Sequence, residues 1–337
     1  YKFLREMEFN RLLSSAISAY GEPNLAGVSP KPKIEENIKT ISKKEYHLLT
    51  DPKQIDDWIK EAEEVGEVAV DTETSSLDPH QAELIGVSLC SRIGKACYIP
   101  IGHNSKKCIN KDIVIKKLKP LLEDPSIKKI GQNIKFDFIV LFKHGINITS
   151  MEDTMLMSYV LDAGKNRHNM DTLSEIHLGH KTISFKDLVG SGKKEINFSE
   201  VDIEKAKDYA AEDADITYRL YKKFNKSLKE EKMVNIYEIF EKPMIKLLAF
   251  MEIEGIKIDS KFLKSLSSKF EKKIEKIQKE VFKISKKEFN IASPKQLGEI
   301  LYNDLKIADL KKTKKGSFAT SAAVLEDLAF KGHKFPQ

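Results

Sequence analysis

The sequence predicts an α/β domain with a mixed central sheet flanked by helices, followed by a mainly α-helical C-terminal segment. Between residues 44 and 232, short apolar runs such as Val68-Ala69-Val70 alternate with stretches of helical periodicity. The turn-like Arg92-Ile93-Gly94-Lys95 joins two of the strands as a hairpin. From residue 233 on, apolar residues follow helical spacing. We therefore expect an N-terminal helix and linker (1–43), an α/β domain (44–232) and a helical part (233–337).

The N-terminal part is expected to contain a helix followed by an irregular linker. Residues 2–20 carry apolar side chains at helical spacing, and Gly21-Glu22-Pro23 ends that pattern. Prolines and scattered charges without periodicity continue to residue 43. The α/β domain should then contain, in order, helix 52–64, strands 67–73, 83–90 and 96–101, helix 111–122, strand 127–130, and helices 134–143, 152–161, 171–177 and 201–228.

The C-terminal part begins with a helix that should stop at Gly255, followed by a short strand. A long lysine-rich helix comes next, and its apolar residues recur every three or four positions. We interpret this stripe as a packing seam with solvated lysines around it; the alternative is a rod that contacts a duplex backbone through its lysines. The stripe consists of Phe262, Leu266, Phe270, Ile274, Ile277, Val281 and Ile284.

Composition indicates an ordinary water-soluble globular protein. Of the 337 residues, 41% are hydrophobic and 32% charged, and no apolar run approaches the length of a membrane span. The net charge of +6 is compatible with nucleic-acid binding without being diagnostic. Because the chain starts at Tyr1 without a signal peptide, we expect a piece of a longer protein. Cys90, Cys97 and Cys108 lack zinc-type spacing, which predicts small free thiols in a reducing, cytoplasmic compartment.

Two carboxylates stand at the end of an apolar strand. Asp71 and Glu73 are two residues apart, so both point to one face. Burying acids there is costly unless they are paired or coordinate a cation. A third acid, Asp137, lies on an otherwise apolar helix, one turn after Asn133, which we expect to cap that helix. Asp137 is expected to pair with a nearby lysine, Lys135 or Lys143, or to face a metal.

Tyr209 and a fourth acid, Asp213, share one face of a helix because they are four residues apart. The neighbouring Asp208, Glu212 and Asp215 point elsewhere on the helical wheel, and we expect them to be solvated. Convergence of the four acids would require cations between them, and carboxylate oxygens suit Mg²⁺ or Mn²⁺. Two such ions side by side indicate phosphoryl transfer on a nucleic acid.

Three short motifs carry a resemblance to a known family. DTET, GQNIKFD and YAAEDAD resemble the exonuclease motifs of the DEDD superfamily, in its tyrosine-bearing branch. NRHNMDTLSEIHLGHKTISFKDLVGSGK, EKPMIKLLAFMEIEGIKID, SPKQLGEIL and TSAAVLEDLA resemble the bacterial family A DNA polymerases, so the likeness extends from about residue 44 onward. LREMEFNRLL is more loosely similar to the region that follows a 5′-nuclease domain in that family.

The resemblance implies a ribonuclease H-like exonuclease fold for residues 44–232 and a partial polymerase thumb for 233–337. Palm and fingers motifs are absent from the sequence, so we expect no nucleotide addition by these residues alone. The implied activity is 3′→5′ hydrolysis of DNA, which releases nucleoside 5′-monophosphates during proofreading in replication and repair. The implied partners are single-stranded or frayed DNA 3′ ends and the palm and fingers of the parent chain, in the bacterial cytoplasm at the nucleoid, with no membrane.

The implied cofactors are two divalent ions, Mg²⁺ or Mn²⁺. By resemblance, Asp71, Glu73 and Asp213 hold one ion, Asp71 shares the second, and Asp137 reaches it through water. Tyr209 is expected to orient the attacking water, since its ordinary pKa near ~10 makes it a poor base.

A frayed 3′ end requires apolar wedges and stacking surfaces. The resemblance places Leu77 against the terminal base and Phe185 beside it; the alternative is that both are plain core residues. Thr74 is implied at the terminal sugar, and Gln132, Asn133 and Arg167 at the sugar-phosphate. His168 receives no role.

Two other functions remain possible from the sequence. A ribonuclease D-like RNA 3′ exonuclease would use the same acids but should end in a separate helical nucleic-acid-binding domain. A non-catalytic scaffold module would not need all four acids and Tyr209. Weak duplex binding is also expected, through the lysine-rich helix (Lys264, Lys269, Lys272, Lys273) and the basic run 311–315.

Overall fold

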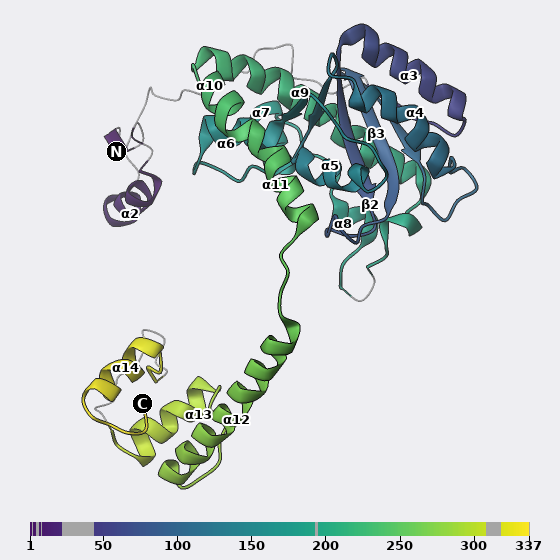
Figure 1. Cartoon of the computed structure of the whole chain (residues 1–337). Helices are drawn as coiled ribbons and strands as arrows, with labels where there is room; N and C mark the ends of the chain where they lie inside the picture. Colours follow the sequence, from purple (N-terminus) through teal and green to yellow (C-terminus); the bar gives the residue numbers. More distant parts are fainter. Residues whose placement is uncertain are drawn as a thin grey trace. The chain divides into compact units, whose positions relative to one another are not determined.

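A computed structural model describes residues 1, 3–4, 7, 9–21, 44–192, 195–307 and 318–336. The chain divides into two compact units, Tyr1–Gly255 and Ile256–Gln337 (Figure 1). Most of the expected linker (22–43) and the basic run 311–315 lie outside the described residues. Among the residues described, no helix has both the length and the apolar character needed to cross a lipid bilayer.

One mixed sheet of six strands forms the centre of the first unit, as far as its described residues go. The strand order is β1-β4-β3-β2-β5-β6. The β4/β3 and β3/β2 pairs are antiparallel, whereas β1/β4, β2/β5 and β5/β6 are parallel. The strands are β1 (Glu45–Leu48), β2 (Glu67–Thr74), β3 (Leu84–Arg92), β4 (Lys95–Pro100), β5 (Lys128–Gly131) and β6 (Met151–Asp153).

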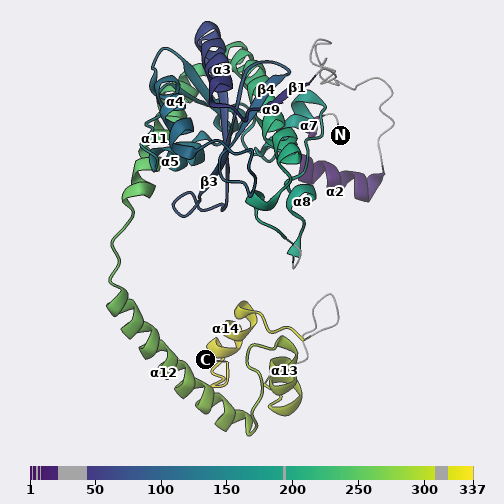
Figure 2. The same cartoon turned by 90° about the vertical axis from the view of Figure 1, so that its right-hand side faces the viewer.

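Helices cover both faces of this sheet, which confirms the expected fold class. Figure 2 shows α3, α4, α5 and α11 on one side, and α7, α8 and α9 on the other. β1, β6, α8 and η3 were not expected; β6 has only three residues, too few to show a period. The helical elements are α2 (Asn10–Tyr20), α3 (Pro52–Val65), α4 (Lys111–Glu123), α5 (Ile134–Phe142), α6 (Thr154–Asp162), α7 (Met170–Leu178), α8 (Phe185–Val189), the 3₁₀ turn η3 (Phe198–Glu200), α9 (Ile203–Glu230), α10 (Val234–Ile236), the π-helical turn η4 (Tyr237–Glu241) and α11 (Lys242–Glu254).

Strand β2 separates two apolar cores. Val68 and Val70 belong to the core that α3, α4 and α5 cover. Ala69, between them, belongs to the core formed with α9. Because side chains alternate along a strand, Asp71 and Glu73 follow Ala69 and also face α9. The alternation therefore directs both acids toward the helix that carries Asp213.

The first unit extends past the expected domain boundary at residue 232. Ile245 and Ala249 of α11 are buried in the core that packs on β2. Phe250 of the same helix makes edge-to-face contacts with Phe138 and Phe142 of α5, with ring centroids 5.6 Å apart in both cases. The compact unit ends at Gly255 because α11 completes the apolar layer over this face of the sheet.

The second unit is small and mainly helical. Residues 256–259, expected as a short strand, form none. The core is built by Ile300, Leu301, Tyr302, Leu328 and Phe335. The helical elements are α12 (Ser260–Ser285), α13 (Pro294–Gly298), the π-helical turn η5 (Glu299–Asp304) and α14 (Ala322–Phe330).

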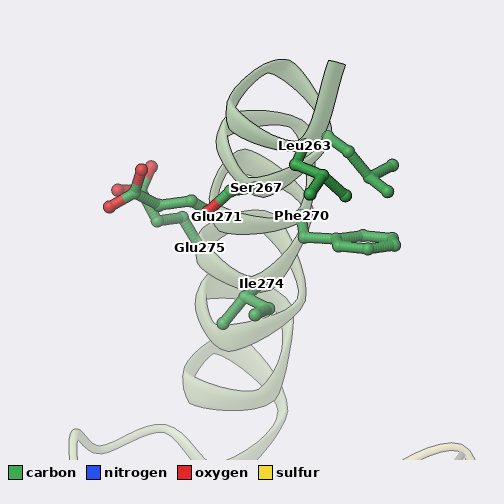
Figure 3. Close-up of a pocket in the computed structure, with 7 residues that line it drawn as sticks. Leu263, Ser267, Phe270, Glu271, Ile274 and Glu275 are labelled. Atoms are coloured by element: carbon green, nitrogen blue, oxygen red, sulfur yellow. The ribbon is translucent and has the colours of Figure 1, made fainter. Parts of the chain in front are cut away.

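The apolar stripe of α12 is mostly exposed. Phe270 and Ile274 project from one flank of the helix, and Glu271 and Glu275 from another (Figure 3). More than half of the surface of Phe270 and of Ile274 is accessible to solvent. Among the described residues, Val281 of the stripe packs against the small core. The interpretation of the whole stripe as a packing seam was therefore wrong for this unit, because helical spacing specifies an apolar face but not a partner for it.

Gly86 on β3 makes room for a buried tyrosine close to the acids of β2. A Cβ at this position would lie 2.2 Å from the hydroxyl oxygen of Tyr98, which is fully buried and hydrogen-bonded to His103 Nε2 at 2.7 Å. We expect Gly86→Ala to lower the free energy of unfolding by about 1–3 kcal/mol, because the overpacked tyrosine must move. Chemical denaturation measures this loss. The loss should shrink in a Tyr98→Leu background, and an equal loss in both backgrounds would contradict this explanation.

Candidate active site

Three carboxylates converge at one end of the sheet. Asp71 and Glu73 come from β2, and Asp213 comes from α9, which packs across the same face. One potential ligand oxygen from each acid lies within 4.8 Å of the other two. The acids line a cavity of about 850 Å³. The geometry brings together two of the motifs that the sequence separates by more than a hundred residues.

Burial and mutual repulsion make this cluster unfavourable as three bare anions. Burial raises the pKa of Asp71 to about 6. Burial, followed by repulsion from Asp71 and Asp213, raises the pKa of Glu73 well above its usual range. Burial and repulsion from Asp71 likewise raise the pKa of Asp213.

A divalent cation would satisfy this arrangement. Glu73 Oε1 is buried and has no hydrogen-bond partner among the described residues. An orphaned carboxylate oxygen of this kind costs free energy unless it accepts a bond or coordinates an ion. Oxygen ligands at this spacing suit a hard ion such as Mg²⁺. Asp71, Glu73 and Asp213 therefore fit a divalent metal site.

Asp137 approaches the same strand from α5 but does not belong to the converging trio. Its Oδ1 accepts hydrogen bonds from the backbone nitrogen and the hydroxyl of Thr72, at 2.9 and 2.6 Å. Burial and repulsion from Asp71 raise its pKa. The expected pairing with Lys135 or Lys143 was wrong: Lys135 pairs with a glutamate of α11, and Lys143 donates to backbone carbonyls.

Asn133 precedes α5 in a left-handed conformation with φ 64°, and its side chain makes no capping hydrogen bond. The expectation that this side chain caps the helix was therefore wrong. The carboxylate of Asp153 accepts from the backbone nitrogens of Asn133 and Ile134 instead, at 3.2 and 3.0 Å. Asp153 was missed; its place directly before the apolar helix α6, as an N-cap residue, was the available signal.

Tyr209 lines the cavity one helical turn before Asp213. Its side chain lies close enough to the Asp213 carboxylate for that charge to act on the hydroxyl. Burial and the charge of Asp213 raise its pKa far above the ordinary value. Tyr209 therefore stays protonated and acts as a hydrogen-bond donor at neutral pH.

Four of the six expected substrate residues line the cavity: Thr74, Leu77, Gln132 and Phe185. Leu77 is 94% exposed and Phe185 is 43% exposed, so neither is a core residue. The remaining two, Asn133 and Arg167, are not among the residues that line it.

The side chain of Gln132 also has structural contacts. Its Nε2 donates to the backbone oxygen of His168 at 2.8 Å, and its Oε1 accepts from Thr154. His168 thus has a structural role through its main chain. Its ring makes an edge-to-face contact with Tyr159 and a hydrogen bond with the Ser158 hydroxyl.

An aromatic wall beside the acids includes one residue that sequence reasoning missed. Phe198 stacks on Phe185 with an interplanar angle of 8° and contacts Tyr209 at a centroid distance of 6.0 Å. It begins η3, which Asn197 caps in a capping box with Glu200. The capping-box spacing was the signal that could have predicted this turn.

Two acids on α9 that we expected to be solvated are buried and paired. Glu212 accepts from Lys44, His180 and the backbone of Ile183. Asp215 accepts from Tyr46, Gly94 and Arg219. The expectation was correct only for Asp208, which pairs with Lys207 at the surface. The prediction that Glu212 and Asp215 are solvated was wrong because α9 packs across most of the sheet and is enclosed on more sides than a surface helix.

Residues 46–229 match the family model described as 3′-5′ exonuclease. The chain belongs to the 3′-5′ exonuclease family. A second model, DNA polymerase family A, matches residues 260–337. The two matches confirm the resemblance drawn from the exonuclease motifs and from the C-terminal segments. They leave residues 230–259 between them, and α11 lies in that interval.

The chain is also similar to bacterial DNA polymerases. DNA polymerase I of Rhizobium leguminosarum is 41% identical over 313 residues, which cover 87% of this chain and 31% of that one. DNA polymerase I of Pseudomonas aeruginosa is 36% identical over 340 residues, covering 99% of this chain and 36% of that one. The chain thus spans about a third of the length of these curated relatives.

A solved structure confirms the fold. The POL domain of Pol1 from M. smegmatis, in a complex with DNA primer-template and dNTP, superimposes with a TM-score of 0.69. The match covers 86% of this chain and 46% of that one, at 22% sequence identity. At this identity the likeness shows the architecture alone.

Proposed function

We propose that this chain is a metal-dependent 3′→5′ exonuclease that removes nucleotides from DNA 3′ ends as nucleoside 5′-monophosphates. The observation that carries the proposal is the convergence of Asp71, Glu73 and Asp213 in a cavity that also exposes Leu77 and Phe185. Acids that fit a divalent ion stand beside apolar side chains that could hold an unpaired base. The two parts of the cavity match the two parts of a 3′-terminal nucleotide, its phosphate and its base.

The acids and Tyr209 have different proposed roles. Asp71, Glu73 and Asp213 would hold the ions, and Asp137 would support the site from the far side of β2. Two divalent ions, Mg²⁺ or Mn²⁺, would supply activation of water and stabilisation of the leaving 3′ oxygen. The protonated Tyr209 hydroxyl, which lines the same cavity as Asp213, would donate a hydrogen bond that orients a water molecule.

The substrate contacts are proposed from the same cavity. Leu77 would wedge against the terminal base, and Phe185, supported by Phe198, would offer a stacking surface. Thr74 and Gln132 would face the terminal sugar and phosphate. Asn133 and Arg167 remain proposals for more distant backbone contacts.

The names of the relatives support a wider setting. We infer that the chain is the proofreading part of a DNA polymerase I that acts in replication and repair in the bacterial cytoplasm, at the nucleoid. Residues 256–337 would be the start of its thumb, and the lysines of α12 would bind duplex DNA weakly. A contact of this kind is electrostatic and would weaken as salt rises.

The test compares 3′ ends in wild-type protein with Mg²⁺. We expect a 5′-labelled single-stranded DNA to shorten from its 3′ end about tenfold faster than a blunt duplex, because an unpaired end does not have to be unstacked. Gel electrophoresis of the labelled products measures both rates. The same sequence as RNA distinguishes the alternative, since faster trimming of RNA would favour a ribonuclease D-like enzyme.

A pair of variants tests the wedge itself. Leu77→Ala should slow hydrolysis of the single strand, whereas Ile93→Ala, which removes another exposed aliphatic side chain in the β3–β4 turn, should not. Equal rates on paired and unpaired ends at saturating enzyme, or equal effects of the two variants, would contradict the proposed substrate binding.

A further inference from the structure

Glu212 is a buried acid next to the active site that the proposed reaction does not use. It follows Tyr209 by three residues on α9 and directly precedes Asp213. The residue is 1% exposed. An acid so deeply buried needs partners for both oxygens, and the identity of these partners indicates its role.

The carboxylate joins three separate segments. Oε1 accepts from Lys44, which precedes β1, and from His180 Nε2 at 3.0 Å. Oε2 accepts from the backbone nitrogen of Ile183 at 2.6 Å. His180 and Ile183 belong to the loop 179–184 that connects α7 to α8. Figure 2 shows α7, α8 and α9 on the same side of the sheet.

The same loop is also held from α7. Ser174 Oγ donates to the backbone oxygen of His180 at 2.8 Å, and Thr182 Oγ1 donates to Asp171 at 2.7 Å. Two residues after Ile183 the chain reaches Phe185, the first residue of α8 and part of the cavity wall. The Phe185 side chain is partly exposed and contacts Tyr209 at a centroid distance of 6.0 Å. Its direction therefore depends on where the loop is fixed.

We propose that Glu212 is a positioning residue: it fixes the backbone at Ile183 and thereby aims Phe185 at the 3′-terminal base. The proposal rests on the proposed exonuclease function and adds a specificity element to it. Glu212 would act on substrate binding through Phe185, although its nearest neighbour in the sequence is the metal ligand Asp213.

Steady-state kinetics on a single-stranded DNA distinguish an effect of Glu212 through Phe185 from an effect through Asp213. We expect Glu212→Ala to raise KM about tenfold, as a misplaced contact would, with kcat within about twofold of wild type. Glu212→Gln keeps an acceptor for the Ile183 nitrogen and should restore most of the affinity. Glu204→Ala, which removes an exposed acid from the same helix, is the matched control and should behave as wild type.

A double-mutant cycle supplies the decisive readout. If Glu212 acts through Phe185, the variant Glu212→Ala/Phe185→Ala should have the KM of Phe185→Ala alone. Mn²⁺ affinity, measured by calorimetry, should be unchanged in Glu212→Ala.

The proposal would be overturned if the KM increases of Glu212→Ala and Phe185→Ala multiplied in the double variant. A lower kcat or weaker Mn²⁺ binding in Glu212→Ala would also overturn it. An inactive wild type would contradict the proposed function itself, whereas normal KM in Glu212→Ala within an active enzyme would contradict only the positioning role. Circular dichroism confirms folding, and Glu212→Gln provides the comparison if the alanine variant does not fold.

Discussion

Replacing Asp71 with alanine should reduce DNA hydrolysis by a factor on the order of a thousand or more, since the proposed metal site would lose one of its three converging ligands. Asp71 is one of three acids whose oxygens converge, and the other two cannot take its position on β2. The fold should persist, because the change removes a partly buried acid that the neighbouring carboxylates repel. Hydrolysis of a labelled single strand at saturating Mg²⁺ measures the loss.

The matched control is Asp208→Ala, which deletes an acid of α9 that pairs with Lys207 at the surface. This variant should retain wild-type activity. A folded Asp71→Ala protein that still degrades DNA at a rate near wild type would show that the three converging acids are not the catalytic site.

Metal ions and pH should control stability through the same acids. The folded state raises the pKa of Asp71 from 3.8 to about 6, so the folded protein binds this proton more tightly than the unfolded chain does. Stability of the metal-free protein is therefore greatest below pH 4 as far as this group is concerned, and it falls as the pH rises through 6. The shift corresponds to about 3 kcal/mol at neutral pH. Mg²⁺ or Mn²⁺ should restore this loss at pH 7.5 and add much less at pH 5.

Denaturant titrations from pH 4 to 8, with EDTA or with Mn²⁺, measure this linkage. Other groups also titrate: burial raises the pKa of Asp153 to about 6 and lowers the pKa of His103, His144 and His177. These contributions remain in Asp71→Ala, so the difference between the two proteins reports Asp71 together with the repulsion that it exerts on Glu73, Asp137 and Asp213. Identical pH profiles for wild type and Asp71→Ala, or no effect of Mn²⁺ at pH 7.5, would contradict the metal-site assignment.

The parts of the site that the sequence predicted depend on short-range geometry. Two-residue spacing on β2 and four-residue spacing on α9 fix the faces of Asp71, Glu73, Tyr209 and Asp213 without knowledge of the tertiary fold. The resemblance to the exonuclease motifs then predicted that the acids on these two faces lie together. Strand and helix bounds in the α/β region were close for the same reason, since their periods are long enough to read.

Partners far away in the chain could not be predicted. Lys44 and Glu212 are 168 positions apart, and no local pattern indicates that they meet. The helical wheel gave the angle of Glu212 correctly but not the fact that α9 is enclosed there. For α12, the wheel likewise predicted the apolar face but not whether anything covers it.

The alternation along β2 has a consequence for how this domain can change over evolution. Alternate residues of β2 contribute apolar side chains to the core under α3, α4 and α5 and the acids Asp71 and Glu73 to the face of α9. Inserting or deleting a single residue before Asp71 would exchange these two sets and bring Thr72 to the face of α9. Single residues of the strand can be substituted, but the alternation that decides which of them face α9 must be kept. Insertions and deletions in related proteins should therefore be confined to loops, where a change in length does not alter which strand residues face α9.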